Sequence, residues 1–228
     1  MRHDKTTPSS PSLRRRSIVL GTGAALAAGG LPLAVQAQAG EDIVIGGSIP
    51  MTGVFAFAGV GINAGIADYV KIANDAGGIK GRKLRYVPED TGYKVDVSVA
   101  AFKKITSQNK VNLYYGDSTG FAKTINPELD RNGQILMAGA SFASELNDPK
   151  KYPNQFLVGP DYTEQIGILL RHIAKEKPAA KVAFVYSDSE FGRDPIEASE
   201  AAARKLGLSV PIKIMTPAGS VDVSTEVI

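Results

Sequence analysis

Residues 43–87 read IVIGGSIPMTGVFAFAGVGINAGIADYVKIANDAGGIKGRKLRYV and decide the fold class. The stretch opens with a short apolar run, residues 43–48, which is typical of a buried strand. Apolar side chains at helical spacing follow and stop at Gly77 and Gly78, where glycine adopts the left-handed conformation that ends many helices. Residues 84–87 predict a second strand. The pattern therefore predicts one β-α-β unit.

The same alternation continues further along the chain. Residues 96–108 and 121–131 have the spacing of helices, and Pro127 marks a kink or an early break in the second of them. Residues 111–115 and 134–138 are apolar runs of strand length. Because strands that alternate with helices form parallel sheets with helices on both faces, we expect a doubly wound α/β fold.

A second α/β region follows a looser, proline-containing stretch at residues 144–160. Its expected elements are helix 163–175, strand 181–186, helix 191–206 and strand 209–215. We therefore expect an N-terminal α/β lobe over 43–158 and a partial second lobe over 161–228. A further helix begins near Ser224, which indicates a C-terminally truncated part of a longer protein.

Composition and charge exclude several functional classes. The formal net charge is +3, but residues 1–37 hold five basic residues and one acidic residue, so the remainder is close to neutral. A nucleic-acid-binding surface is therefore not expected. The chain has no cysteine, and His172 is its one histidine outside residues 1–37. We expect no disulfide, no thiol nucleophile, no bound metal and no cofactor.

Residues 1–37 have the features of a cleaved export signal. Arg14, Arg15 and Arg16 precede a weakly apolar stretch rich in alanine and glycine, and small residues around Ala37 provide a cleavage site. The arginine pair is similar to a twin-arginine signal, but Arg14 stands where such signals carry Ser or Thr. We expect a periplasmic protein, exported by either the Tat or the Sec route.

The loops that follow the strands are the expected place for a ligand, because doubly wound sheets bind ligands at the carboxyl ends of their strands. Three of these loops are rich in Gly, Ala, Ser and Thr. We expect a clamp for an anion or a zwitterion, built from Ser118, Thr119, Gly120, Ala140 and Ser141. The alternative is that the hydroxyls only cap the following helices.

Aromatic residues lie along the same edge of the predicted sheet. Phe57, Phe142 and Phe191 fall in loops among small or polar residues, so we expect them to form the apolar walls of a ligand cleft. Phe121 lies in a predicted helix, where packing in the hydrophobic core is the simpler interpretation.

Residues 116–120, GDSTG, also match the G-x-S-x-G motif of serine hydrolases, with Ser118 as the nucleophile. A catalytic triad also needs a histidine near the nucleophile. His172 falls inside a predicted helix and away from the strand ends. The position of His172 disfavours a triad, so we expect a non-enzymatic binding protein. A secreted serine hydrolase that uses Ser118 is the alternative.

Several motifs resemble one known family. Residues 74–84, NDAGGIKGRKL, are similar to the N-x-x-G-G-I-x-G-R-x-L signature of branched-chain amino acid (Leu/Ile/Val-type) ABC transporter substrate-binding proteins. Residues 43–53 resemble the opening strand and P-x-T/S-G loop of the same family. Residues 188–192, DSEFG, resemble its D-x-x-Y/F-G turn. The resemblance spans about residues 43–228.

The resemblance implies the two-lobed type I periplasmic binding fold, whose lobes close on a ligand at a hinge. It also implies a monomeric, non-enzymatic receptor that delivers its ligand to an ABC permease in the inner membrane. A sensory ligand-binding domain of the same fold is a further possibility.

Carried over by position, Thr119, Gly120, Ala140 and Ser141 would hold the head group of an amino acid, and Phe191 would cover it from the second lobe. The chain departs from the family at three positions. Ala58, Phe142 and Phe191 replace a tyrosine, a threonine and a tyrosine. The resemblance therefore implies amino acids or related small carboxylates or amides as ligands, without selecting one of them.

Overall fold

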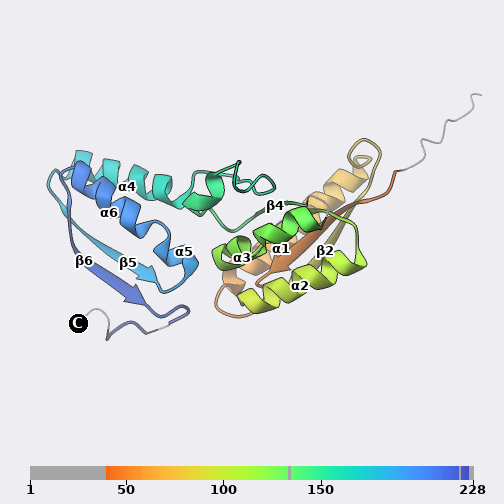
Figure 1. Ribbon diagram of the computed structural model, residues 1–228, viewed down its shortest axis with the longest axis horizontal. Coiled ribbons are helices and arrows are strands. Elements are labelled where there is room, and N and C mark those ends of the chain that lie inside the picture. The colour runs from red at the N-terminus through yellow and green to blue at the C-terminus, as the bar shows by residue number, and fades with distance from the viewer. Residues whose placement is uncertain (1–39, 133–134, 221, 226–228) are drawn as a thin grey trace, which may run out of the picture. The chain divides into compact units, whose positions relative to one another are not determined.

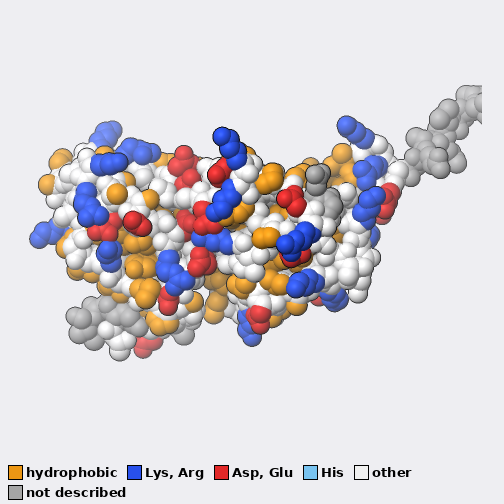
Figure 2. All heavy atoms as spheres, viewed as in Figure 1, with side chains coloured by type: hydrophobic (Ala, Val, Ile, Leu, Met, Phe, Trp, Pro, Cys, Tyr) orange, Lys and Arg blue, Asp and Glu red, His pale blue; other side chains and the backbone are white. Residues whose placement is uncertain are grey.

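The computed structural model describes residues 40–132, 135–220 and 222–225 (Figure 1). The export signal expected at residues 1–37 lies outside the described residues and stays a prediction. The described chain forms two parallel sheets, one of four strands and one of two. Figure 2 shows acidic and basic side chains interspersed over the face in view.

The first sheet has the strand order β2-β1-β3-β4, and every neighbouring pair is parallel. Its strands are β1 (Ile43–Ile49), β2 (Leu84–Asp90), β3 (Val111–Gly116) and β4 (Leu136–Gly139). The chain adds β2 on one side of β1 and then crosses over to add β3 and β4 on the other side. Because such connections are right-handed, the first helix covers one face of the sheet and the next two helices cover the opposite face. The predicted doubly wound sheet is confirmed.

Three helices cover the first sheet: α1 (Ala56–Asp75), α2 (Val95–Gln108) and α3 (Thr119–Arg131). The main hydrophobic core lies where α2 and α3 pack on the sheet and on each other. Phe102 and Tyr114 meet edge to face, with ring centroids 4.9 Å apart. Phe121 is fully buried beside them, so its predicted place in the core is confirmed.

Two boundaries in this region differ from the prediction. β2 continues beyond the strand expected at 84–87 and includes Glu89 and Asp90, because Ser48 and Ile49 of β1 still pair with them. α3 begins at Thr119 and continues through Pro127 without a break. Leu129, two residues further on, is fully buried, so its packing outweighs the loss of the backbone hydrogen bond that Pro127 cannot make.

The second sheet pairs β5 (Lys181–Ser187) with β6 (Ser209–Thr216). A short 3-10 helix, η1 (Ser144–Asn147), precedes α4 (Tyr162–Glu176), and α5 (Glu190–Arg193) and α6 (Ile196–Lys205) lie between the two strands. The core of this region contains Leu170, Phe184, Ala203 and Leu208.

The single helix expected at residues 191–206 is wrong, because the structure has α5 and α6 in its place. Pro195 lies between them and has no N–H to donate to a continuous helix. Ser224 lies in a turn, and the helix expected to begin there falls largely outside the described residues. None of the described helices combines the length and the apolar character needed to cross a membrane.

Candidate ligand-binding site

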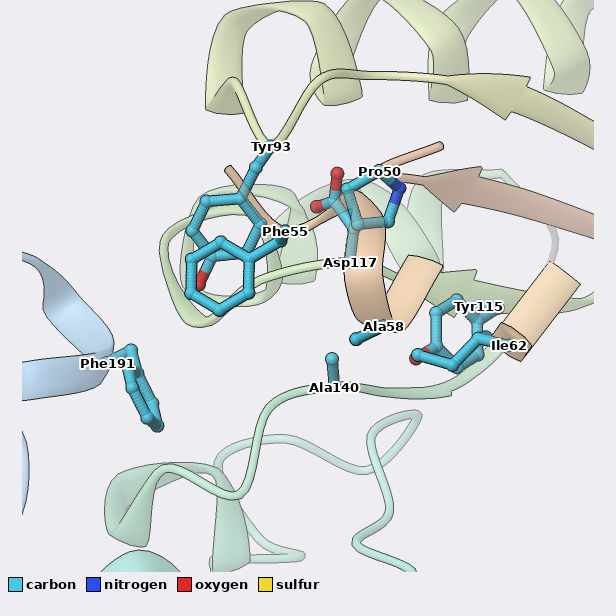
Figure 3. Close-up of a pocket in the computed structure, with 9 residues that line it drawn as sticks. All are labelled: Pro50, Phe55, Ala58, Ile62, Tyr93, Tyr115, Asp117, Ala140 and Phe191. Atoms are coloured by element: carbon cyan, nitrogen blue, oxygen red, sulfur yellow. The ribbon is translucent and has the colours of Figure 1, made fainter. Parts of the chain in front are cut away.

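A cavity of about 90 Å³ lies at the carboxyl ends of the strands of the first sheet (Figure 3). Each strand contributes one lining residue just after its end: Pro50 after β1, Tyr93 after β2, Asp117 after β3 and Ala140 after β4. The remaining lining residues are Phe55, Ala58, Ile62, Tyr115 and Phe191. The cavity therefore occupies the part of the fold where doubly wound proteins bind ligands.

Asp90, the last residue of β2, joins the first two of these loops. Its Oδ1 accepts hydrogen bonds from the amides of Met51, at 2.9 Å, and Thr52, at 3.1 Å. Its Oδ2 accepts one from the Thr52 hydroxyl at 2.8 Å. Desolvation alone would raise the pKa of Asp90, but the hydrogen bonds, led by the one from the Thr52 side chain, outweigh it and lower the pKa below its usual value.

The two loops approach each other so closely that a side chain would not fit at Gly53. Gly53 has φ +78°, and a Cβ built there would lie 2.9 Å from the Gly92 carbonyl oxygen. Glycine meets both demands, because it adopts positive φ without penalty and adds no side-chain atom. The close contact fixes the backbone that leads into Phe55 and Tyr93.

Phe55 and Tyr93 form one wall of the cavity. Their ring centroids are 3.9 Å apart with an interplanar angle of 32°, and Figure 3 shows the two rings overlapping. Tyr93 has φ +65°, which is a strained conformation for a bulky residue. Such strain persists only where surrounding contacts impose it, and it is frequent at binding sites.

Asp117 is a buried carboxylate in the wall of the cavity, with 1% of its surface exposed. Its Oδ2 accepts hydrogen bonds from the hydroxyls of Thr91 and, at 2.8 Å, Ser98. Its Oδ1 accepts one from the Ser118 hydroxyl at 3.0 Å. Burial raises the pKa of Asp117 above its usual value, although the three hydrogen bonds act in the opposite direction. This carboxylate connects the β2–α2 loop, α2 and the start of α3.

A chain of hydroxyl groups supports the loop after β4. The Ser141 hydroxyl donates to Thr119 Oγ1 at 3.0 Å, and Thr119 Oγ1 lies 3.3 Å from the Tyr162 hydroxyl. The Tyr162 hydroxyl donates to the Ala140 carbonyl oxygen at 3.1 Å. Each hydroxyl proton in this order has an acceptor within the protein, so the network is satisfied without a ligand.

Phe191, from α5, reaches the cavity from the side of the second sheet. Its ring meets the ring of Tyr162 edge to face, with centroids 5.2 Å apart and an interplanar angle of 75°. Figure 3 shows Phe191 on the blue ribbon, on the opposite side of the labelled group from Tyr115 and Ile62.

Comparison with known proteins agrees with this geometry. A family model described as periplasmic binding protein matches residues 42–228. The chain belongs to the periplasmic binding protein family. A branched-chain amino acid ABC transporter protein from Thermus thermophilus, solved with bound valine, is 30% identical with a TM-score of 0.72, covering 82% of this chain and 48% of that chain. The expected type I periplasmic binding fold is confirmed.

Two curated members of the family show the same partial overlap. "Leu/Ile/Val-binding protein homolog 3" of Brucella melitensis is 27% identical over 74% of this chain and 45% of its own length. "Amino acid binding protein" of Pseudomonas aeruginosa is 27% identical over 77% of this chain and 47% of its own length. The chain thus spans about half the length of these relatives.

Of the site residues predicted from the sequence, the structure places Ala140 and Phe191 at the cavity. Phe57 does not line it, because its side chain points out from the first turn of α1 and is 81% exposed. Phe142 packs against the first core and against Tyr162, with ring centroids 6.0 Å apart. Contact of each predicted residue with a ligand stays a prediction.

The hydroxyl groups of the predicted clamp form hydrogen bonds within the protein. Ser118, Thr119 and Ser141 are buried, and their hydroxyls bind the protein itself. Gly120 lies in the first turn of α3, against Val95. The capping alternative holds for Ser118, whose Oγ accepts a hydrogen bond from the Phe121 amide at 3.3 Å.

The same contacts argue against Ser118 as a hydrolase nucleophile. Its hydroxyl donates a hydrogen bond to Asp117 and accepts one from the Phe121 amide. His172, the histidine within the described part of the chain, is exposed on α4. The G-x-S-x-G match is therefore explained by the connection from β3 to α3, in which Ser118 caps the helix.

Sequence reasoning missed four of the nine residues that line the cavity and that include most of its aromatic rings: Phe55, Tyr93, Tyr115 and Asp117. Their position after strand ends was a usable signal for Tyr93 and Asp117. The aromatic character of Tyr93, between Gly92 and a lysine, was a second one. Nothing in the sequence indicates that Phe55, and not Phe57, faces inward.

Proposed function

We propose that this chain is the solute-binding part of a non-enzymatic receptor that serves an ABC importer. The observation that carries the proposal is the cavity at the ends of all four strands of the first sheet, in a chain that belongs to the periplasmic binding protein family. Its wall combines aromatic and small apolar side chains with few polar groups, which is the usual composition of a small-molecule site.

The proposal includes the organisation expected from the sequence. Residues 43–158 form the N-terminal lobe and residues 161–228 a part of the second, and Phe191 closes the cavity from the second lobe. Residues 1–37 direct the protein to the periplasm by the Tat or the Sec route. A monomer delivers the ligand unchanged to a permease in the inner membrane.

The ligand is an amino acid or a related small carboxylate or amide. Support comes from the relatives, which are named as Leu/Ile/Val-binding and amino acid binding proteins, and from bound valine in the Thermus thermophilus structure. The size of the cavity, about 90 Å³, suits one compact group of such a molecule.

A thermal-shift screen tests the proposal on the protein as its host produces it. Amino acids, amides and small carboxylates are added one at a time, and each compound that raises Tm is then recovered and analysed by NMR. A receptor binds at least one of them and returns it chemically unchanged. Conversion of the bound compound, or a screen without any shift, would contradict the proposal.

A further inference from the structure

The cavity has an unusual balance of charge for a site expected to hold an acid. Four of its nine lining residues carry aromatic rings: Phe55, Tyr93, Tyr115 and Phe191. Asp117 is the charged member of the set, and among these nine described residues there is no lysine, arginine or histidine. The lining therefore offers negative charge and ring faces, and it offers no cation to a carboxylate.

The charge of Asp117 acts across the cavity wall. The pKa of Tyr93 is raised to about 12, mainly by burial. The charges of Tyr162 and Asp117 act in the same direction. Burial and the negative charge of Asp117 also raise the pKa of Tyr115 to about 12. Both phenols are therefore neutral at physiological pH, and the potential around them favours a positive group.

Asp117 itself is closed to a direct contact. It is 1% exposed and already accepts hydrogen bonds from Thr91, Ser98 and Ser118. Figure 3 shows its carboxylate turned toward Pro50 and away from Ala140. Its contribution to a ligand is consequently the field of a buried charge and not a hydrogen bond.

Ring faces attract cations, and groups of aromatic rings hold methylated ammonium ions in particular. A primary ammonium needs acceptors for its three N–H groups, whereas a trimethylammonium needs none and gains from contact with apolar walls. Phe55 and Phe191 have no hydrogen-bonding atoms in their side chains, and Ala58 and Ala140 leave room between the rings. The lining thus suits a methylated cation better than a primary ammonium.

We propose that this cavity takes the methylated ammonium end of a small zwitterion of the betaine class. The inference rests on the proposed function, since it names the ligand class of the same receptor. A primary amino acid and a carboxylate with a neutral branched alkyl group are the competing occupants.

Isothermal titration calorimetry separates these occupants with a matched set of compounds. Glycine betaine and 3,3-dimethylbutanoate have the same shape, and only the first has a positive nitrogen. Valine supplies a primary ammonium. We expect glycine betaine to bind at least about 10-fold more tightly than either of the others, because only it combines positive charge with methyl groups.

Equal affinity for glycine betaine and 3,3-dimethylbutanoate would overturn the inference, as would a preference for valine. The proposed function survives either outcome, because a solute is still bound. Failure of every compound, here and in the thermal-shift screen, would contradict the proposed function itself.

Variants locate the binding in this cavity. Phe55→Leu keeps an apolar side chain but removes a ring, so we expect affinity for glycine betaine to fall by about 3- to 30-fold. Phe57→Leu is the matched control, because this neighbouring ring is exposed and does not line the cavity. Phe55→Tyr restores the ring and should restore the affinity.

Asp117→Asn tests whether the negative charge of this carboxylate contributes to binding of the cation. It should weaken binding of glycine betaine and leave binding of 3,3-dimethylbutanoate unchanged or improved, because only the cation interacts favourably with the carboxylate. Circular dichroism checks that the variant is folded. An equal loss for both compounds, or an unchanged affinity after Phe55→Leu, would contradict the inference.

Discussion

The ammonium nitrogen of Lys123 on α3 lies 3.1 Å from Oε2 of Glu190 on α5, so one ion pair connects the helices of the two α/β regions. The same nitrogen lies 3.3 Å from Glu145 Oε2 and 3.6 Å from Asp194 Oδ1. Asp194 is held in turn by the Ser144 amide, at 3.0 Å. Partial burial disfavours the charged lysine, but the Glu190 hydrogen bond and the charge of Glu145 prevail and raise the pKa of Lys123.

A double-mutant cycle with Lys123→Met and Glu190→Gln should give a modest coupling free energy. We expect about 0.2–1 kcal/mol, because Glu190 is 45% exposed and water screens the pair. The coupling should shrink in 1 M salt. Urea unfolding at two salt concentrations measures it, with Lys71→Met and Asp75→Asn on α1 as an exposed control pair. A coupling that does not respond to salt would contradict this description.

Asp117→Asn should change how stability depends on pH. Burial raises the pKa of Asp117 above the ordinary 3.8, so the folded chain binds this proton more tightly than the unfolded chain. The resulting stabilisation is complete below pH 3.8 and is lost as the pH rises through the folded-state pKa. The Tm of the variant relative to the wild type should therefore rise as the pH increases from 3.8 through the folded-state pKa of Asp117, and level off above it.

Asp90→Asn is the control with the opposite sign. The pKa of Asp90 is lowered, so its stabilisation is present above pH 3.8 and is lost as the pH falls through the folded-state pKa. The Tm of this variant relative to the wild type should fall as the pH rises from the folded-state pKa of Asp90 to 3.8, below the range in which Asp117 acts. Parallel pH profiles for the two variants would show that the two carboxylates do not have these environments.

Gly59→Ala and Gly65→Ala should have opposite effects on stability, although both lie in α1. A Cβ at Gly59 would lie 2.0 Å from the Pro50 carbonyl oxygen, so the helix would have to move from the loop that lines the cavity. Apart from its chain neighbours and the backbone of its own helix, nothing lies within 4 Å of a Cβ at Gly65. Urea unfolding should show a loss of more than about 1 kcal/mol for the first and a gain of up to about 1 kcal/mol for the second. Similar values for both would contradict the close contact at Pro50.

Ser118→Ala should lower stability and leave ester hydrolysis unchanged. The substitution removes the cap of α3 and a hydrogen bond to Asp117, a loss of about 0.5–2 kcal/mol. Ser107→Ala, at an exposed position of α2, is the control and should change stability by less than about 0.5 kcal/mol. A p-nitrophenyl acetate assay would contradict the capping role if hydrolysis by the wild-type chain disappeared in Ser118→Ala.

The fold could be predicted because its signals are local and repeated. The apolar run at residues 43–48 and the glycines after α1 indicate their elements without reference to the rest of the chain. Boundaries that depend on distant partners were wrong. Glu89 and Asp90 are polar, and only their register with β1 keeps them in the strand.

The site could be predicted only as a set of loops. Which side chain faces the cavity depends on contacts between loops that are distant in sequence. Tyr93 points inward because Asp90 and the Gly53 contact impose the backbone before it. The Thr119 hydroxyl is engaged by Tyr162, which comes from another helix, and by the Ser141 hydroxyl. No spacing rule reveals such partners.

The carboxylate of Asp117 is shared by hydroxyls from three separate segments, represented by Thr91, Ser98 and Ser118. A change in the hydrogen bond from one segment to this carboxylate also affects the hydrogen bonds from the other two. Attempts to alter selectivity by grafting a single loop from a relative should therefore show strong epistasis. Successful transplants would need to move all three segments as one block, together with the acid that they share.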